Sequence, residues 1–143
     1  MTYANILIVE DNPYDEELAL HTLQSIQAIK NIHVARDGEE ALDFLFQKGK
    51  QSLPCFILLD LKLPKINGIE VLKKIKGSEA TKLIPTIVFS SSQLGKDRKT
   101  CYQLGANSYV AKPVEFDEYV KIITQIGTYW STYNAPVPQE ATD

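Results

Sequence analysis

The chain has 143 residues, 44% of them hydrophobic, and a formal net charge of −3 at pH 7. This length suits one globular domain with a single core, and without a surplus of basic residues nucleic acid is not expected as a partner. No apolar run approaches the roughly 20 residues that cross a bilayer, and the first residues lack the features of a secretory signal, so we expect a cytoplasmic protein without membrane contact.

Short apolar runs alternate with longer amphipathic segments, as in proteins whose strands alternate with helices. The first run, 5–9, predicts a strand, and Pro13 after the candidate N-cap Asn12 begins a helix that continues to about residue 28. The other predicted strands are 32–35, 55–60, 86–90 and 108–111. The other predicted helices lie between 37 and 49 and at 67–77, 94–104 and 115–130.

Capping residues mark several helix ends. Asp37 and Glu40 have the spacing of a capping box at the start of the second helix. Gly49 and Gly77 are expected to end the second and third helices, and Gly105 is a candidate for the left-handed residue that follows a helix.

Five β-α units in succession predict a parallel α/β sheet with helices on both faces. The run 55–60 is apolar almost throughout, which fits a central strand buried on both sides. Residues 1–130 account for the whole domain. The segment 131–143 contains two prolines and few apolar residues, so a mobile tail is expected there.

Polar residues follow four of the predicted strands. Glu10 and Asp11 follow the first, Asp60 ends the third, Ser90 ends the fourth and Lys112 follows the fifth. The carboxyl ends of parallel strands meet at one crevice of an open sheet. Three carboxylates in one crevice repel one another, so a divalent cation is expected, and Mg²⁺ prefers such oxygen ligands.

This combination suits chemistry at phosphorus. A carboxylate beside Mg²⁺ and a lysine can attack a phosphoryl group and form an aspartyl phosphate. The metal ion and Lys112 would neutralise charge on the transferring group. Ser90 could donate its hydroxyl to the new phosphoryl oxygens.

In these residues the chain resembles a response-regulator receiver domain over about residues 5–128. The matching motifs are Ile-Val-Glu-Asp-Asn-Pro at 8–13, Leu-Leu-Asp-Leu-Lys-Leu-Pro at 58–64, Asn-Gly at 67–68, Phe-Ser-Ser at 89–91 and Gly-Ala-Asn-Ser-Tyr-Val-Ala-Lys-Pro at 105–113. Each motif alone is weak, whereas all of them in this order and spacing are highly specific.

The resemblance implies a doubly wound, flavodoxin-like sheet of five strands in the order 2-1-3-4-5. It implies Asp60 as the phosphoacceptor and Glu10 with Asp11 as the acidic pair that serves Mg²⁺. The main-chain carbonyl of Lys62 would be a further metal ligand. We also hypothesise that the Lys62 side chain modulates access of water or a partner to the phosphoryl group.

The resemblance also assigns the residues of a switch. Ser90 would be the switch hydroxyl, Tyr109 the switch aromatic and Lys112 the phosphate-binding lysine, while Pro113 would follow a cis peptide bond. Phosphorylation would then reshape the surface of the fourth helix, fifth strand and fifth helix. The implied protein is a signalling phosphoacceptor that catalyses only its own Mg²⁺-dependent phosphorylation and dephosphorylation, and otherwise not an enzyme.

A narrower likeness is to the single-domain regulators paired with bacterial and cyanobacterial phytochromes. It rests on Glu-Asp-Asn-Pro, on Leu-Pro-Lys-x-Asn-Gly, on the longer spacer 48–54 and on the aromatic-rich segment 129–133. It implies a sensor histidine kinase of the phytochrome type as partner, and a homodimer. Trp130 and the neighbouring tyrosines are expected at a dimer contact, unless they cover the protomer's own core.

Several of these residues also have a purely structural interpretation. Glu10 and Asp11 could be the acidic residues that favour a helix N-terminus. Ser90, with two serines after it, could serve only a loop, and Tyr109 could be a half-buried packing residue. Cys55 and Cys101 are expected to be free thiols, since neither has a partner at metal-ligand spacing.

Other functional classes fit less well. A phosphatase with an aspartate nucleophile usually carries a second aspartate two residues on, where this chain has Lys62. A flavin carrier needs a phosphate-binding loop after the first strand, where Glu10 and Asp11 would repel phosphate. A receiver domain used only as a scaffold would not need all of the polar residues at the strand ends, which are Glu10, Asp11, Asp60, Ser90 and Lys112.

Overall fold

The computed structural model describes residues 4–47 and 52–138. Within them, five parallel strands form one sheet in the order β2-β1-β3-β4-β5. The strands are β1 (Ala4–Val9), β2 (Ile29–Ala35), β3 (Phe56–Leu59), β4 (Thr86–Ser90) and β5 (Ser108–Ala111). The helices are α1 (Pro13–Gln24), α2 (Gly38–Leu45), α3 (Gly68–Gly77), α4 (Gly95–Leu104), α5 (Phe116–Thr128) and the short π-helix η1 (Tyr129–Tyr133).

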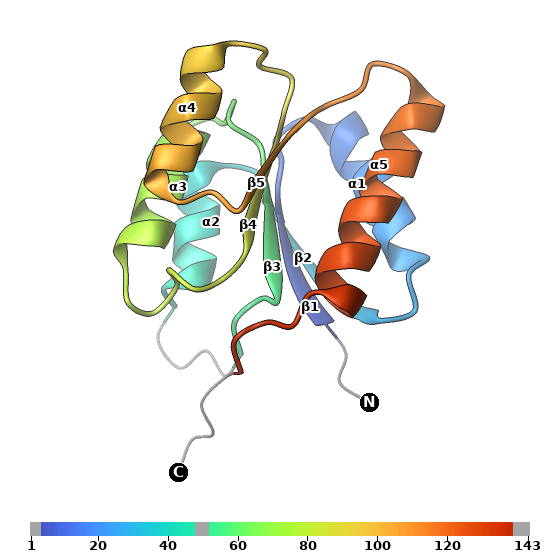
Figure 1. Ribbon diagram of the computed structural model, residues 1–143, viewed down its shortest axis with the longest axis horizontal. Coiled ribbons are helices and arrows are strands. Elements are labelled where there is room, and N and C mark those ends of the chain that lie inside the picture. The colour runs from blue at the N-terminus through green and yellow to red at the C-terminus, as the bar shows by residue number, and fades with distance from the viewer. Residues whose placement is uncertain (1–3, 48–51, 139–143) are drawn as a thin grey trace.

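The helices cover both faces of the sheet, so the predicted doubly wound α/β fold is confirmed (Figure 1). Helices α1 and α5 lie on one face, and α2, α3 and α4 lie on the other. Because successive side chains of a strand point to opposite faces, β1 divides its apolar residues between the two layers. Leu7 packs with the α2–α4 layer, and Ile6 and Ile8 pack with the α1–α5 layer.

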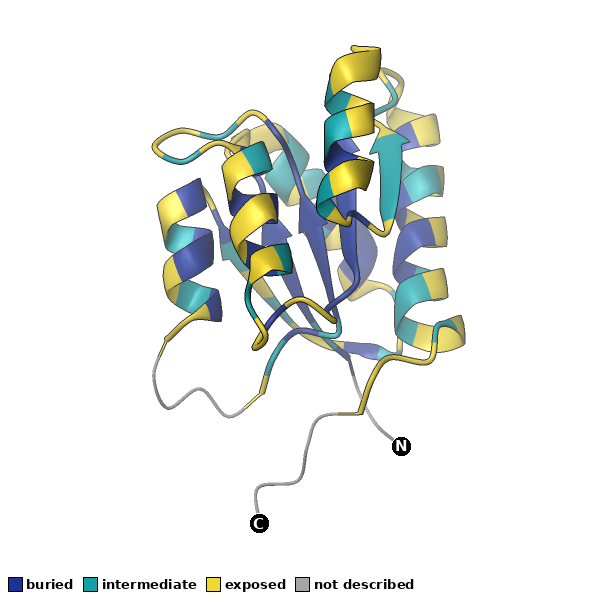
Figure 2. Ribbon diagram, turned by 60° about the vertical axis from the view of Figure 1, so that its left-hand side comes forward, coloured by how far each residue is buried: buried dark blue, intermediate teal, exposed yellow. Residues whose placement is uncertain are grey.

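Strand β3 is buried along its whole length, as its apolar sequence predicts. Figure 2 shows the buried strands between helices whose outer faces are exposed. A central strand with both faces covered can carry a polar group only at its end, where the sheet opens. Asp60 occupies that position.

Three element boundaries differ from the prediction by three residues or more, those of β2, α1 and α2. Strand β2 begins at Ile29, three positions before the predicted start, because Ile29 is buried and pairs with Ala4 of β1. Helix α1 correspondingly ends at Gln24, where the Ser25 hydroxyl donates to the Thr22 carbonyl. The apolar spacing of the intervening residues suits a helix, but pairing with β1 extends the strand instead.

Two glycines hold the loop that leaves β3. A β-carbon at Gly68 would overlap the carbonyl of Asp60, and one at Gly38 would overlap the carbonyl of Ile66. The Gly68 N–H donates to the Leu61 carbonyl over 2.9 Å. The loop after Asp60 is therefore packed directly against the first residues of α2 and α3.

The predicted helix caps agree with the structure where it describes them. Asn12 Oδ1 accepts the N–H groups of Tyr14 and Asp15, and Asp37 Oδ1 accepts that of Glu40. Gly105 follows α4 in the left-handed conformation. Helix α2 ends at Leu45 with Phe46 as its C-cap, so the predicted helix stop at Gly49 is wrong. Part of the spacer 48–54 lies outside the described residues.

The C-terminal end of α5 continues as η1 to Tyr133, three residues beyond the predicted domain boundary. Trp130 is half-buried and packs against the core on the α1–α5 side, as the own-core interpretation predicts. Tyr129 and Tyr133 are exposed. The segment 134–138 has no helix or strand, and the last five residues of the predicted tail lie outside the described residues.

None of the helices in the described part of the chain combines the length and the apolar character needed to cross a membrane. Cys55 and Cys101 are free thiols, as predicted.

Candidate functional site

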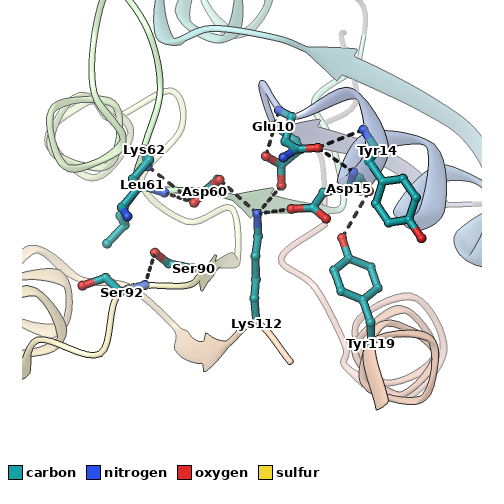
Figure 3. Close-up of polar contacts among 11 residues, drawn as sticks. Glu10, Tyr14, Asp15, Asp60, Leu61, Lys62, Ser90, Ser92, Lys112 and Tyr119 are labelled. Carbon is teal, nitrogen blue, oxygen red and sulfur yellow. Dashed lines mark hydrogen bonds and ion pairs between the residues drawn. The ribbon is translucent and has the colours of Figure 1, made fainter. Parts of the chain in front are cut away.

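The predicted site residues meet at the carboxyl edge of the sheet. Main-chain hydrogen bonds between neighbouring strands fix where along the sheet these residues lie. The Asp60 N–H donates to the Val9 carbonyl, and the Lys112 N–H donates to the Ser90 carbonyl. Glu10, Asp60 and Ser90 are buried. Figure 3 shows the side chains of Glu10, Asp60 and Lys112 pointing toward one another from three different segments.

The ammonium of Lys112 is the centre of this site. Its Nζ donates to Glu10 Oε1 over 2.6 Å, to Asp15 Oδ2 over 3.0 Å and to Asp60 Oδ2 over 3.1 Å (Figure 3). A lysine has three N–H donors, so these three carboxylates use all of them.

The Asp60 carboxylate is held on both sides. Oδ2 accepts from Lys112, and Oδ1 accepts the main-chain N–H of Leu61 over 2.7 Å. The Lys62 N–H lies 3.4 Å from the same Oδ1. The carboxylate is thus oriented by a charged donor and by the backbone of its own loop.

Burial and charge shift the proton equilibria of two groups. Burial, and next the negative charge of Asp60, raise the pKa of Glu10 to about 7, although Lys112 opposes this shift. For Lys112, burial would lower the pKa, but hydrogen bonds and attraction from Glu10, Asp60 and Asp15 outweigh burial and raise it. Burial is the larger cause of the raised Glu10 pKa, and the charge of Asp60 adds to it even beside Lys112.

The acidic residues fit a divalent metal ion. Glu10, Asp11 and Asp60 each provide a carboxylate oxygen, and these oxygens lie within 4.8 Å of one another. Asp11 is exposed, so its carboxylate faces the solvent side of the cluster. Hard cations are bound by such oxygen donors. The Lys62 side chain is exposed, and the metal-ligand role of its carbonyl stays a prediction.

Ser90 and Tyr109 contact the same loop residue. The buried Ser90 Oγ accepts the Ser92 N–H over 3.1 Å, and the half-buried Tyr109 donates its hydroxyl to the Ser92 carbonyl over 3.1 Å. The Ser92 hydroxyl in turn donates to Asp97 of α4. The two predicted switch residues are therefore joined through Ser92, while the switch itself stays a prediction.

Asp15 belongs to the site but was not predicted from the sequence. It lies in the first turn of α1, where an acidic residue also favours the helix N-terminus. The sequence therefore does not distinguish Asp15 from an acidic residue that only favours the helix N-terminus. Its main chain is fixed by the N-cap Asn12 and by the Tyr119 hydroxyl, which donates to the Asp15 carbonyl over 3.1 Å.

The expected cis bond before Pro113 is wrong for this structure. No peptide bond among the described residues is cis, so the Lys112–Pro113 bond is trans. The two isomers before proline differ by only about 0.5–1 kcal/mol. The loop around Pro113 therefore decides which isomer forms, and the sequence motif that contains Pro113 does not.

Comparison with known proteins gives a consistent result. The family model for the response regulator receiver domain matches residues 6–124. The chain is 38% identical over 131 residues to "Probable methanogenesis regulatory protein FilR2" of Methanothrix harundinacea, covering 90% of this chain and 84% of that protein. It is 35% identical over 128 residues to response regulator Rcp1 of Synechocystis, covering 87% of each.

Solved structures agree with the sequence comparison. The phosphorylated cyanobacterial phytochrome response regulator RcpA superposes with a TM-score of 0.90 at 34% identity, covering 94% of this chain and 99% of that one. The Mn²⁺-bound form of Rcp1 superposes with a TM-score of 0.89 at 33% identity and the same coverage of 94% and 99%. The family match covers most of the chain and includes all four strand ends that form the site, so this protein belongs to the response regulator receiver domain family.

Proposed function

We propose that Asp60 accepts a phosphoryl group from a phosphohistidine of a sensor histidine kinase, and that the phosphorylated protein then signals through a changed surface. The observation that carries this proposal is the contact of Lys112 Nζ with both Asp60 and Glu10 at the carboxyl edge of the sheet. A buried carboxylate beside a lysine and two further acidic residues is suited to phosphoryl transfer.

In the proposed step an Asp60 oxygen bonds to phosphorus while the phosphorus–nitrogen bond of the phosphohistidine breaks. The histidine nitrogen leaves with the bonding electron pair. Lys112 would neutralise part of the charge that the phosphoryl group brings, roughly −1.5 to −2 at neutral pH. The protein would promote only its own phosphorylation and dephosphorylation, and it would not turn over another substrate.

The proposed cofactor is Mg²⁺, held by Glu10, Asp11, Asp60 and the carbonyl of Lys62. When bound it would supply positive charge to the transferring group. Two observations support a hard divalent cation: the three clustered carboxylates and the Mn²⁺-bound form of the related Rcp1. Mg²⁺ usually keeps several waters and takes only a few protein ligands, which suits a cluster with one exposed carboxylate.

The contacts of Ser92 suggest how the surface would change. If Ser90 turned its hydroxyl toward a phosphoryl oxygen, Ser92 would lose the acceptor of its N–H. Ser92 also binds the Tyr109 hydroxyl and Asp97 of α4. A displacement of Ser92 would therefore reach α4 and β5, within the proposed output surface of α4, β5 and α5.

We further propose that the partners are a histidine kinase of the phytochrome type and a second copy of this chain, in the cytoplasm. The kinase is suggested by the similarity to RcpA and Rcp1. The α4–β5–α5 surface carries opposite charges on its two helices, with exposed Lys96 and Lys99 on α4 and exposed Asp117 and Glu118 on α5. A two-fold dimer places the same patch of each copy against the other, which would bring these charges together.

The phosphoacceptor is tested with acetyl phosphate and Mg²⁺. The wild type should acquire an acid-labile phosphoryl group, and the Asp60→Asn variant should not. Asp43→Asn, in an exposed position of α2, removes an equal charge and serves as the control. Labelling of Asp60→Asn at the wild-type level would contradict the proposal.

Gel filtration with Mg²⁺, in the presence and absence of beryllofluoride, tests the dimer. A shift to larger size with beryllofluoride would support phosphorylation-dependent dimerisation. An unchanged dimer in both conditions would make the assembly constitutive, and a monomer in both would contradict it.

A further inference from the structure

In this structure Lys112 has no N–H left for a phosphoryl group. Its three donors are matched by Glu10, Asp15 and Asp60 at distances between 2.6 and 3.1 Å. Phosphorylation as proposed above converts the Asp60 carboxylate into an acyl phosphate, so Lys112 can give the phosphoryl group more than the donor that Asp60 already holds only by releasing Glu10 or Asp15. The identity of the released carboxylate affects how strongly the unphosphorylated state resists phosphorylation.

The exposure of the three carboxylates distinguishes them. The side chain of Asp15 is 25% exposed, against 5% for Glu10 and 8% for Asp60. A charged group that loses its partner costs least where water can replace the partner. Asp15 is therefore the acceptor that Lys112 can release most readily.

The main chain of Asp15 is held independently of Lys112. Its N–H donates to the N-cap Asn12, and its carbonyl accepts the hydroxyl of the buried Tyr119. Tyr119 in turn packs edge-on against Phe89 of β4, with ring centroids 5.3 Å apart. These contacts hold the Asp15 backbone in place independently of Lys112, so only the side-chain torsions of Asp15 could carry its carboxylate toward Asp60.

We infer that Asp15 is a positioning residue that holds Lys112 in the unphosphorylated state and competes with the phosphoryl group for its third N–H. This inference rests on the proposed function, because it assigns Asp15 a part in the same reaction. Asp15 lies outside the strand-end set that supplies the phosphoacceptor and the clustered metal ligands. By holding Lys112, Asp15 would shift the equilibrium between the unphosphorylated and the phosphorylated protein.

The test is titration of the intact protein with beryllofluoride in the presence of Mg²⁺. Asp15→Asn and Asp15→Ala remove a charged acceptor that only the free state uses, so both should bind beryllofluoride more tightly, by about two- to tenfold. Asp43→Asn, which removes a carboxylate from α2, should bind it as the wild type does. The hydrogen bonds that fix the Asp15 main chain do not involve its side chain, so both variants retain them.

The sign of the change separates this role from a merely structural one. A variant with a loosened site would bind beryllofluoride more weakly, whereas loss of a competitor strengthens binding. Unchanged or weaker binding by the Asp15 variants would overturn the inference while leaving the proposed function intact. Failure of the wild type itself to bind beryllofluoride would instead count against the proposed function.

A crystal structure of the wild type with Mg²⁺ and beryllofluoride provides the direct measurement. We expect Lys112 Nζ to contact the fluoride ligands and to lie beyond hydrogen-bond distance of Asp15. A retained Lys112–Asp15 hydrogen bond in that complex would overturn the inference, whatever the affinities show.

Discussion

Lys112 Nζ lies 2.6 Å from Glu10 Oε1, although the two residues are 102 positions apart in the chain. The contact joins the loop after β1 to the loop after β5, which come from opposite ends of the domain sequence. It also places the half-buried ammonium of Lys112 among carboxylates that otherwise repel one another. The stability of the protein and its proposed reactivity therefore depend on the same ion pairs.

Lys112→Ala should destabilise the metal-free protein. The substitution leaves Glu10 and Asp60 buried without their cation, and removing one partner of a buried ion pair typically costs about 3–5 kcal/mol. The free energy of unfolding from urea titration measures this effect. Lys121→Ala, in an exposed position of α5, should change it by less than about 0.5 kcal/mol. Equal stability of the two variants would mean that the ion pairs contribute nothing.

Glu10 should make the stability of the metal-free protein depend on pH. Its pKa is raised from 4.5 to about 7, so between these values the folded state binds more protons than the unfolded state. Stability from this group is then fully present below about pH 4.5 and is lost as the pH rises through about 7. Urea titrations of wild type and Glu10→Gln in a chelator should show the variant gaining about 1–3 kcal/mol relative to wild type across this range.

A pH-independent difference between wild type and Glu10→Gln would contradict the raised pKa. Saturating Mg²⁺ provides a second check. Carboxylate ligands must be deprotonated to bind metal, so the ion should favour ionised Glu10 and reduce the gain of the variant.

Ser90→Ala should lower the free energy of unfolding by about 1 kcal/mol, because the Ser92 N–H loses its acceptor. If Ser90 is the switch hydroxyl, the variant should also lose the coupling between beryllofluoride binding and the α4–β5–α5 surface. Hydrogen exchange of α4 with and without beryllofluoride reports that coupling. The neighbouring Ser91→Ala, at an exposed position, should behave as wild type in both measurements. An undiminished response in Ser90→Ala would exclude the switch role.

Gly68→Ala should disturb the loop that carries Asp60. The added β-carbon would overlap the Asp60 carbonyl and the Leu61 Cα, so the backbone has to shift. We expect a loss of about 2–4 kcal/mol in stability together with weaker labelling by acetyl phosphate. Gly77→Ala is a close control, since a β-carbon there meets nothing within 4 Å and should leave both properties unchanged. Comparable losses in the two variants would show that general helix effects, and not the close approach, are responsible.

Local patterns in the sequence predicted most of the fold. Apolar runs ending in polar residues located β1, β3 and β4, and capping residues located the starts of α1 and α2. These features act over a few residues, so they can be recognised without the rest of the chain. The start of β2 escaped prediction because Ile29 is drawn into the sheet by pairing with Ala4, a partner that is distant in the sequence.

The residues of the candidate site also fall into those that local sequence patterns predict and those that only long-range contacts reveal. Glu10, Asp11, Asp60, Ser90 and Lys112 could be named from the sequence because each stands at the end of a recognisable strand. Asp15 could not, since its contact with Lys112 spans 97 positions and depends on how α1 is placed over the edge of the sheet.

The amino-acid sequence by itself determined the order of strands and helices and the polar residues at the strand ends. Only the tertiary structure decided that three carboxylates share one lysine, that Trp130 packs against its own core, and that the bond before Pro113 is trans. The physical reason is that helix caps and apolar runs are stabilised by neighbours in the chain. Ion pairs and packing between layers are stabilised by groups that only the folded chain brings together.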